Sequence, residues 1–164
     1  FVSNPIYDYV KGVNEAYEGS KLSRGIVFFK PDIIVIHDKI INESEEVVQQ
    51  IFNFAPNANV ELLSNDELVA NIENEEAHFK QLININETEI FSGDRETPRA
   101  VISEEFGKLT DNTQASFTQQ GKSVEFVTII TLGNGKKKLE KTTFDSKKGM
   151  LNICISGEEY KIII

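Results

Sequence analysis

The sequence predicts an all-β protein built as an antiparallel, multi-stranded β-sandwich. Short runs rich in β-branched and aromatic residues recur along the chain, and turn residues separate them at short intervals. Sustained apolar spacing of three and four residues, which is typical of helices, is nearly absent. Since each antiparallel sheet must bury one face, so many short strands favour two packed sheets, and a third layer of strands can be added outside them.

The first hairpin is the clearest element. Arg24–Phe29 and Ile33–Ile41 flank Lys30-Pro31-Asp32, where proline presets a turn and aspartate can cap it. Further strands are predicted at Glu46–Phe54, Val60–Leu63, Glu67–Ile72, Ala77–Ile83, Glu89–Ser92, Arg99–Ser103, Ala115–Gln119, Ser123–Leu132, Lys138–Phe144, Met150–Ser156 and Glu159–Ile164.

Ser123–Leu132 is predicted to be a central strand, because it carries apolar residues on both faces. Gln120-Gly121 is expected to divide it from the strand before, and Gly133-Asn134-Gly135 to end it. Asn42–Glu46 is expected to be a solvated acidic loop.

Residues 1–23 differ from the rest and are interpreted as a loop-like lead-in to a sandwich domain over residues 24–164. They contain three of the four tyrosines, together with Gly12 and Gly19. The chain begins without an initiator methionine or a signal peptide. We therefore expect it to be a piece of a longer polypeptide.

Composition limits the partners. The 164 residues include 17 Lys+Arg and 26 Asp+Glu, a formal charge of −9 that disfavours nucleic acid as a partner. No apolar stretch approaches the roughly 20 residues of a membrane span, so no membrane partner is expected. The single cysteine, Cys154, excludes an internal disulfide but leaves the compartment open. A periplasmic or secreted location is slightly favoured.

Arg24 and Asp38 are the strongest candidates for a paired site. With Lys30–Asp32 in the turn, the two residues lie opposite each other on an otherwise apolar face. A buried charge needs a partner, so a structural ion pair is favoured over a catalytic role.

Tyr7, Tyr9 and Tyr17, with Arg24 close behind in sequence, are candidate substrate-binding residues. They could form a sugar-stacking platform or supply a phenol for proton transfer, whereas simple packing is the alternative. The two histidines, His37 and His78, have no metal-site spacing and are expected to be core or solvated residues.

Several phrases resemble the C-terminal β-domain of the heparinase II/III family of polysaccharide lyases. Tyr9-Val10-Lys11-Gly12 matches a Tyr-x-x-Gly lead-in, and Arg24–Asp38 matches an Arg-starting strand, a Lys-Pro-Asp turn and a strand ending in Asp. Phe52–Pro56 resembles the phrase that follows. Pro98–Gly107 and Phe117–Leu132 are similar to later family segments, so the resemblance spans nearly the whole chain.

The resemblance implies a two-part lyase, with an upstream helical (α/α) toroid, this sandwich downstream, and the glycan in the cleft between them. Such enzymes eliminate across a uronic acid: a base takes the C5 proton, a second group neutralises the carboxylate, and an acid protonates the leaving oxygen. Most of those groups sit on the toroid. No catalytic residue is therefore assigned to this chain, which would support the cleft without acting alone.

Two departures from the family bear on metal and function. Family members often carry a histidine shortly before the arginine of the first strand, and some carry a second in the strand after the aspartate, for catalysis or a structural zinc. Leu22 or Ser23, and Asn53, occupy those places here. Asp38 is the one remnant of such a site, so no zinc or other cofactor is expected. The alternative function is a noncatalytic carbohydrate-binding or structural module in exopolysaccharide metabolism.

Overall fold

The computed structural model describes residues 1–94, 96, 99–133 and 138–164, and these form strands, turns and loops without a helix. Accordingly, no helix among the described residues is long and apolar enough to cross a membrane. The strands are β1 (Val2–Ser3), β2 (Tyr7–Asn14), β3 (Ser20–Phe29), β4 (Ile33–Asn53), β5 (Asn59–Ser64), β6 (Glu67–Ile72), β7 (Glu75–Gln81), β8 (Glu87–Ser92), β9 (Val101–Glu105), β10 (Lys108–Asp111), β11 (Thr113–Leu132), β12 (Leu139–Asp145), β13 (Met150–Ile155) and β14 (Glu158–Ile163).

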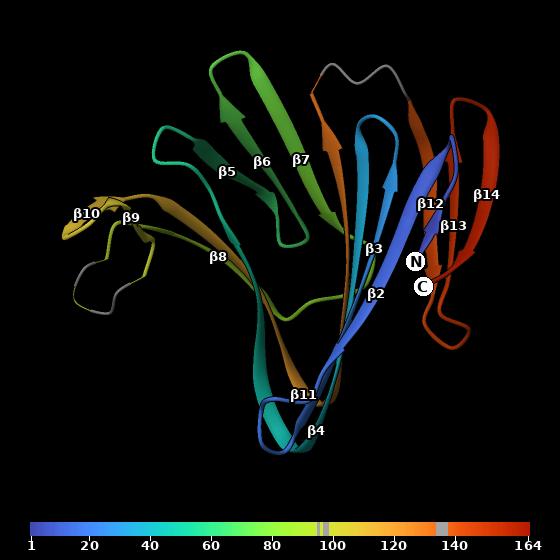
Figure 1. The fold of residues 1–164 in the computed structure, drawn as a ribbon, viewed down its shortest axis with the longest axis horizontal. Helices are drawn as coiled ribbons and strands as arrows, with labels where there is room; N and C mark the ends of the chain where they lie inside the picture. Colours follow the sequence, from blue (N-terminus) through green and yellow to red (C-terminus); the bar gives the residue numbers. More distant parts are fainter. Residues whose placement is uncertain (95, 97–98, 134–137) are drawn as a thin grey trace.

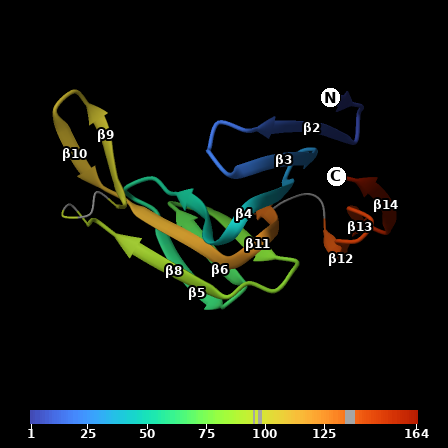
Figure 2. The ribbon, with the colours of Figure 1, turned by 90° about the horizontal axis from the view of Figure 1, so that it is seen from below.

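The strands form one large sheet, one small sheet and a separate hairpin. The nine-stranded sheet runs β1-β2-β3-β4-β11-β7-β6-β5, with β8 paired to β11. Strands β12, β13 and β14 make the small sheet, and β9 and β10 make the hairpin that projects at one end (Figures 1 and 2). Every pairing is antiparallel, which confirms the predicted fold class.

The large sheet is folded on itself, because β4 and β11 are long strands that bend together (Figure 1). Their register shifts at the bend, where Gly121 pairs with Glu46 but Ser123 pairs with Ile41. Residues 42–45 therefore bulge out opposite Lys122 alone. Bulges of this kind sharpen the local bend of a strand.

Two sequence predictions fail at this bend. Asn42–Glu46 was expected to be a loop, and Gln120-Gly121 was expected to divide two strands. Both segments instead lie within continuous strands. The acidic side chains were the misleading signal, because an exposed bulge solvates them as well as a loop does.

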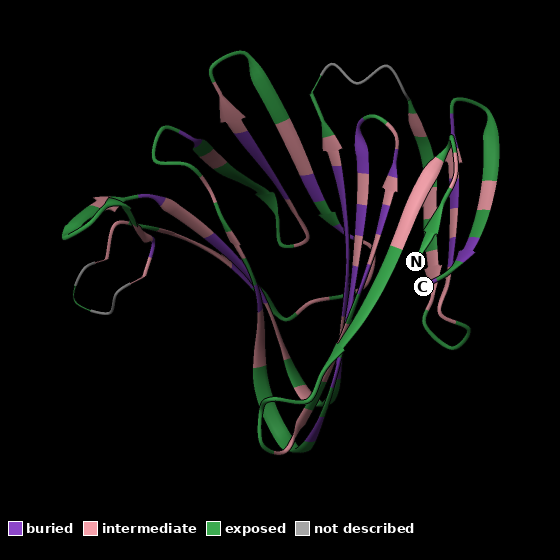
Figure 3. Ribbon diagram, in the orientation of Figure 1, coloured by how far each residue is buried: buried purple, intermediate pink, exposed green. Residues whose placement is uncertain are grey.

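Two apolar cores form, one on each face of the large sheet. Buried residues recur along its central strands, whereas the β9–β10 hairpin is mostly exposed (Figure 3). On one face, Val27, Phe29 and Val35 pack against Leu151 and Ile153 of the small sheet. This gives the outer strand layer that the sequence allowed. On the other face, the second half of β4 and the first half of β11 fold back, so that the Phe52 ring meets those of Phe79 and Phe117.

Strand β11 is central, as predicted. It pairs with β4, β7 and β8, and Phe126, Val127 and Ile129 on its two faces are buried. The glycine turn predicted to end it reaches Asn134 and Gly135, which lie outside the described residues.

The loop expected over residues 1–23 is replaced in large part by strands. β2 pairs with β3 in regular register, with Tyr7 opposite Phe29 and Tyr9 opposite Val27. Tyrosine favours strands, and Gly12 is tolerated in a strand next to the sheet edge. Residues 15–19 form the connecting loop. Whether residues 1–23 also link to an upstream domain remains a prediction.

Candidate functional site

The site begins at the β3–β4 hairpin, whose predicted register is confirmed. Arg24 pairs with Asp38, Ile26 with Ile36 and Phe29 with Ile33. The Arg24 guanidinium donates from Nε to Asp38 Oδ1 and from Nη2 to Asp38 Oδ2, both at 2.6 Å. The Asp38 side chain is 3% exposed, whereas that of Arg24 is 50% exposed. A buried carboxylate is thus held by a cation that still reaches solvent.

A chain of buried polar side chains continues behind Asp38. Gln50 Nε2 donates to Asp38 Oδ2 at 2.9 Å, and Gln50 Oε1 accepts from Thr128 Oγ1 at 2.6 Å and from Gln81 Nε2 at 2.9 Å. Gln81 Nε2 also donates to Thr128 Oγ1 at 2.8 Å. All four residues are buried. Such a network is costly unless its members are paired. Gln81 Oε1 has no partner among the described residues, whereas the other polar side-chain atoms of the network are hydrogen-bonded.

The sequence did not reveal Gln50, Thr128 and Gln81. Thr128 and Gln81 are register partners on the neighbouring strands β11 and β7, and Gln50 reaches them because β4 folds back. The available signal was weak: Gln50 and Thr128 are polar residues within otherwise apolar strands, a pattern that indicates either a buried network or a solvated face.

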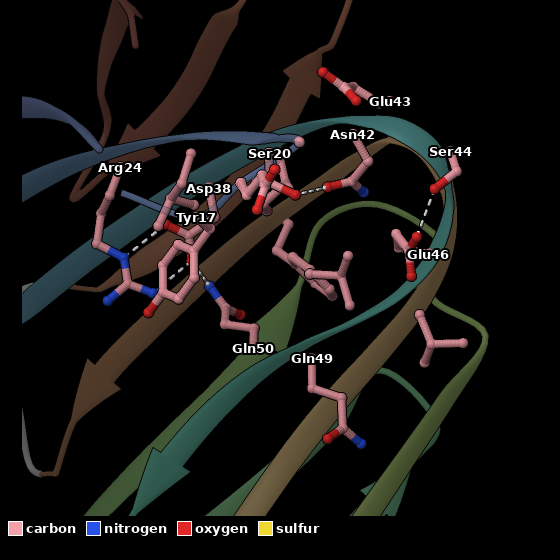
Figure 4. A pocket seen from close by; sticks show the side chains of 17 residues that line it. Tyr17, Ser20, Arg24, Asp38, Asn42, Glu43, Ser44, Glu46, Gln49 and Gln50 are labelled. Atoms are coloured by element: carbon pink, nitrogen blue, oxygen red, sulfur yellow. Dashed lines mark hydrogen bonds and ion pairs between the residues drawn. The ribbon is translucent and has the colours of Figure 1, made fainter. Parts of the chain in front are cut away.

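Arg24, Asp38 and Gln50 lie at one side of a hollow of about 730 Å³ (Figure 4). This volume is within the range of small-ligand sites. The hollow extends along the start of β3 and the bend of β4, and its lining includes Tyr17 from the 15–19 loop. A neighbouring hollow of about 360 Å³ shares Tyr17 and Glu43 with it.

Carboxylates dominate the charge of the larger hollow. Glu18, Glu43 and Glu46 line it, and Arg24 is the only lysine or arginine among its described lining residues. Ser44 Oγ donates to Glu46 Oε1 at 2.6 Å. The hydrogen bond to Asp38 raises the pKa of Arg24, so this guanidinium stays charged. The hollow therefore presents one fixed cation within an acidic surround.

The predicted substrate-binding residues separate onto two faces. Tyr17 and Arg24 line the hollow, and the Tyr17 residue is 66% exposed. Tyr7 and Tyr9 lie on the opposite face of the sheet and pack against the core beneath the small sheet. The Tyr7 ring lies 5.6 Å from that of Phe29, and burial raises the pKa of Tyr9. Tyr7 and Tyr9 therefore pack against the core, which is the alternative to a binding role.

The histidines lie away from the hollow. His37 is buried on the small-sheet face, where its Nε2 lies 2.8 Å from Glu125 Oε1 and its ring contacts Phe144. His78 lies on β7, with its Nε2 2.7 Å from Glu76 Oε1. Neither side chain lines the hollow that contains Asp38.

The surroundings of Asp38 do not fit a zinc site. Both of its carboxylate oxygens accept hydrogen bonds from N–H donors, which are guanidinium and amide groups that do not ligate zinc. Over residues 1–94, 96, 99–133 and 138–164, no group of three His, Cys, Asp or Glu residues is arranged to hold a metal ion.

Comparison with known proteins identifies the fold. No protein-family model and no curated protein sequence matches the chain. Among solved structures, heparan sulfate lyase HepC from Pedobacter heparinus matches 99% of this chain with a TM-score of 0.77 and 15% identity. The fold is shared with heparinase III. A structure of heparinase III matches 98% of the chain with a TM-score of 0.73, and that of the heparinase III BT4657 gene product matches 97% with 0.71, each at 14% identity.

The heparinase III match covers one part of a longer protein. The chain spans about a quarter of each solved chain: 26% of HepC, 26% of heparinase III and 26% of the BT4657 gene product. At such low identity the similarity establishes the fold alone. Any chemical role must therefore be argued from the residues of this chain.

Proposed function

We propose that this chain is the β-domain of a larger heparinase-like polysaccharide lyase and forms a glycan-holding wall of its cleft. The observation that carries the proposal is the match in fold over 99% of this chain and 26% of a heparan sulfate lyase. The remaining length of such a lyase would supply the upstream helical domain and most of the reacting groups.

The chemistry of the hollow supports a holding role. Elimination across a uronate needs a base, an acid and a group that neutralises the carboxylate. Arg24 could serve the last purpose. The carboxylate of Asp38 is committed to Arg24 and Gln50, and His37 lies on the opposite face of the sheet. We therefore expect the isolated chain to be inactive.

A noncatalytic carbohydrate-binding or structural module is the second candidate. The observation that favours it is the chemistry around Arg24, where Leu22 rather than a histidine shares the hollow. In both cases Tyr17 and Arg24 would contact the glycan, but only a lyase domain requires a catalytic partner upstream.

Elimination activity tests the proposal. We would compare this chain with the same protein extended upstream, using the ultraviolet absorbance of the unsaturated sugar end formed on unsulfated and sulfated uronate polymers. Activity in the extended protein alone is the expected result. Silence of both proteins on all polymers, combined with glycan binding by this chain, would instead favour the noncatalytic module.

A further inference from the structure

Arg24 has unused hydrogen-bonding capacity at the hollow. A guanidinium has five N–H donors, and Asp38 takes one from Nε and one from Nη2. The other three have no acceptor among the described residues. Half of the side chain is exposed, and Gly12, the register partner of Arg24 on β2, leaves open space because a Cβ there would meet no atom within 4 Å.

Gln50 determines where Asp38 can lie. It is 3% exposed and donates to the same oxygen, Oδ2, that accepts from Arg24 Nη2. Its own amide oxygen is fixed by two donors, Thr128 Oγ1 and Gln81 Nε2. Gln50, on the folded-back half of β4, thus helps to fix the orientation of Arg24, because its amide holds the Asp38 carboxylate and that carboxylate holds the guanidinium.

We propose that Gln50 is a positioning residue that, through Asp38, holds Arg24 ready to bind the single carboxylate of a uronate unit. The proposal rests on the proposed function, since it assigns to the hollow the part of the glycan that it recognises. Gln50 does not touch the glycan itself. Its effect is to keep the free edge of the guanidinium in one orientation.

A carboxylate is the group that this geometry fits. The free N–H groups of a guanidinium form a planar fork that matches two carboxylate oxygens. A fork that is held in advance loses little conformational entropy on binding. Because Arg24 is the only cation among the described lining residues, the hollow offers a place for one anionic group rather than for several.

Binding to two matched oligosaccharides tests the inference. We would titrate the 164-residue chain with an unsulfated tetrasaccharide of alternating hexuronate and N-acetylhexosamine, and with its carboxyl-reduced form. The wild-type chain should prefer the carboxylated form by about tenfold, the worth of one good charge-assisted contact. Gln50→Met should abolish that preference, and the Arg24 Nε–H signal in the NMR spectrum should shift.

Gln81→Met is the matched control. Gln81 is as buried as Gln50 and shares its network, but it makes no contact with Asp38. It should lower the melting temperature while keeping the tenfold preference, because Thr128 Oγ1 still donates to Gln50 Oε1 and Gln50 Nε2 still donates to Asp38 Oδ2. If Gln50→Met does not fold, Gln50→Asn, whose shorter amide cannot reach Asp38, takes its place.

The outcomes separate the inference from the proposed function. Equal binding of both tetrasaccharides by the wild type would overturn the inference and leave the glycan-holding function standing. Binding of neither would count against the function itself. Equal loss of preference in Gln50→Met and Gln81→Met would reduce Gln50 to a structural residue and overturn the positioning role.

Discussion

Asp38 and Gln50 lie twelve residues apart on the same strand, yet Gln50 Nε2 donates to Asp38 Oδ2 at 2.9 Å. Two residues of one straight strand at that separation would be about 40 Å apart. They meet because β4 bends at the bulge of residues 42–45 and its second half folds back over the first. The bend therefore forms part of the hollow and brings Gln50 to its lining, next to Asp38.

The Arg24–Asp38 pair should respond asymmetrically to mutation. Arg24→Met leaves a buried carboxylate without its cation and should cost about 3 kcal/mol of unfolding free energy. Asp38→Asn should cost only about 1 kcal/mol, because the half-exposed Arg24 can turn to water. Urea unfolding of both variants measures the difference. Equal losses would show that Asp38 is hydrated in solution.

Acid should destabilise the domain through Glu125. Burial alone would raise the pKa of Glu125, but hydrogen bonds from His37 and Ser146 outweigh it and lower that pKa below the ordinary 4.5. As pH falls from about 4.5, the unfolded chain binds the proton first, so the contribution of Glu125 is lost as pH passes through the folded pKa. Glu125→Gln should flatten the dependence of stability on pH in this range. An unchanged slope would contradict the assignment.

Tyr17 and Tyr9 should differ in glycan binding. Tyr17→Ala removes an exposed ring from the hollow and should weaken binding of an unsulfated uronate oligosaccharide by about tenfold, a typical loss for a stacking contact. Tyr9→Phe should leave the affinity within about twofold, since that ring packs under the small sheet. Titration calorimetry on both variants checks the pair. A loss confined to Tyr9→Phe would move the binding surface to the other face.

The acidic surround should disfavour sulfated glycans. Glu46→Gln removes one carboxylate from the hollow and should tighten binding of a sulfated oligosaccharide about threefold at low salt, with the gain fading as salt is added. Glu45→Gln is the control, because Glu45 is exposed on the same strand but does not line the hollow. An equal gain in both variants would indicate that net charge, rather than the hollow, decides binding.

The sequence predicted local features well and tertiary ones poorly. The Lys30–Asp32 turn determined the hairpin register, which placed Arg24 opposite Asp38, and the two-sided apolar pattern of Ser123–Leu132 predicted a central strand. Pairing Asp38 with Gln50 instead depends on where a strand folds back. That information lies in the packing of Phe52 against Phe79 and Phe117, which no local pattern contains.

Some predictions fall where the structure gives no description. Pro98, at the start of one family-like segment, and Lys136-Lys137, just before the strand predicted from Lys138, lie outside the described residues. The strand predicted from Arg99 begins at Val101 instead, because Arg99 forms a bridge with Asp94 and lies over the ring of Phe91. The sequence around Arg99 gave no signal for its contact with the Phe91 ring.

The long strands β4 and β11 also have a consequence for cooperativity. Each gives one half to the layer beneath the small sheet and the other half to the layer that folds back. Cleavage within either strand would remove packing residues from both cores at once, so we expect neither layer to stay folded without the other. We expect the domain to melt in one transition and to resist proteolysis until it unfolds as a whole.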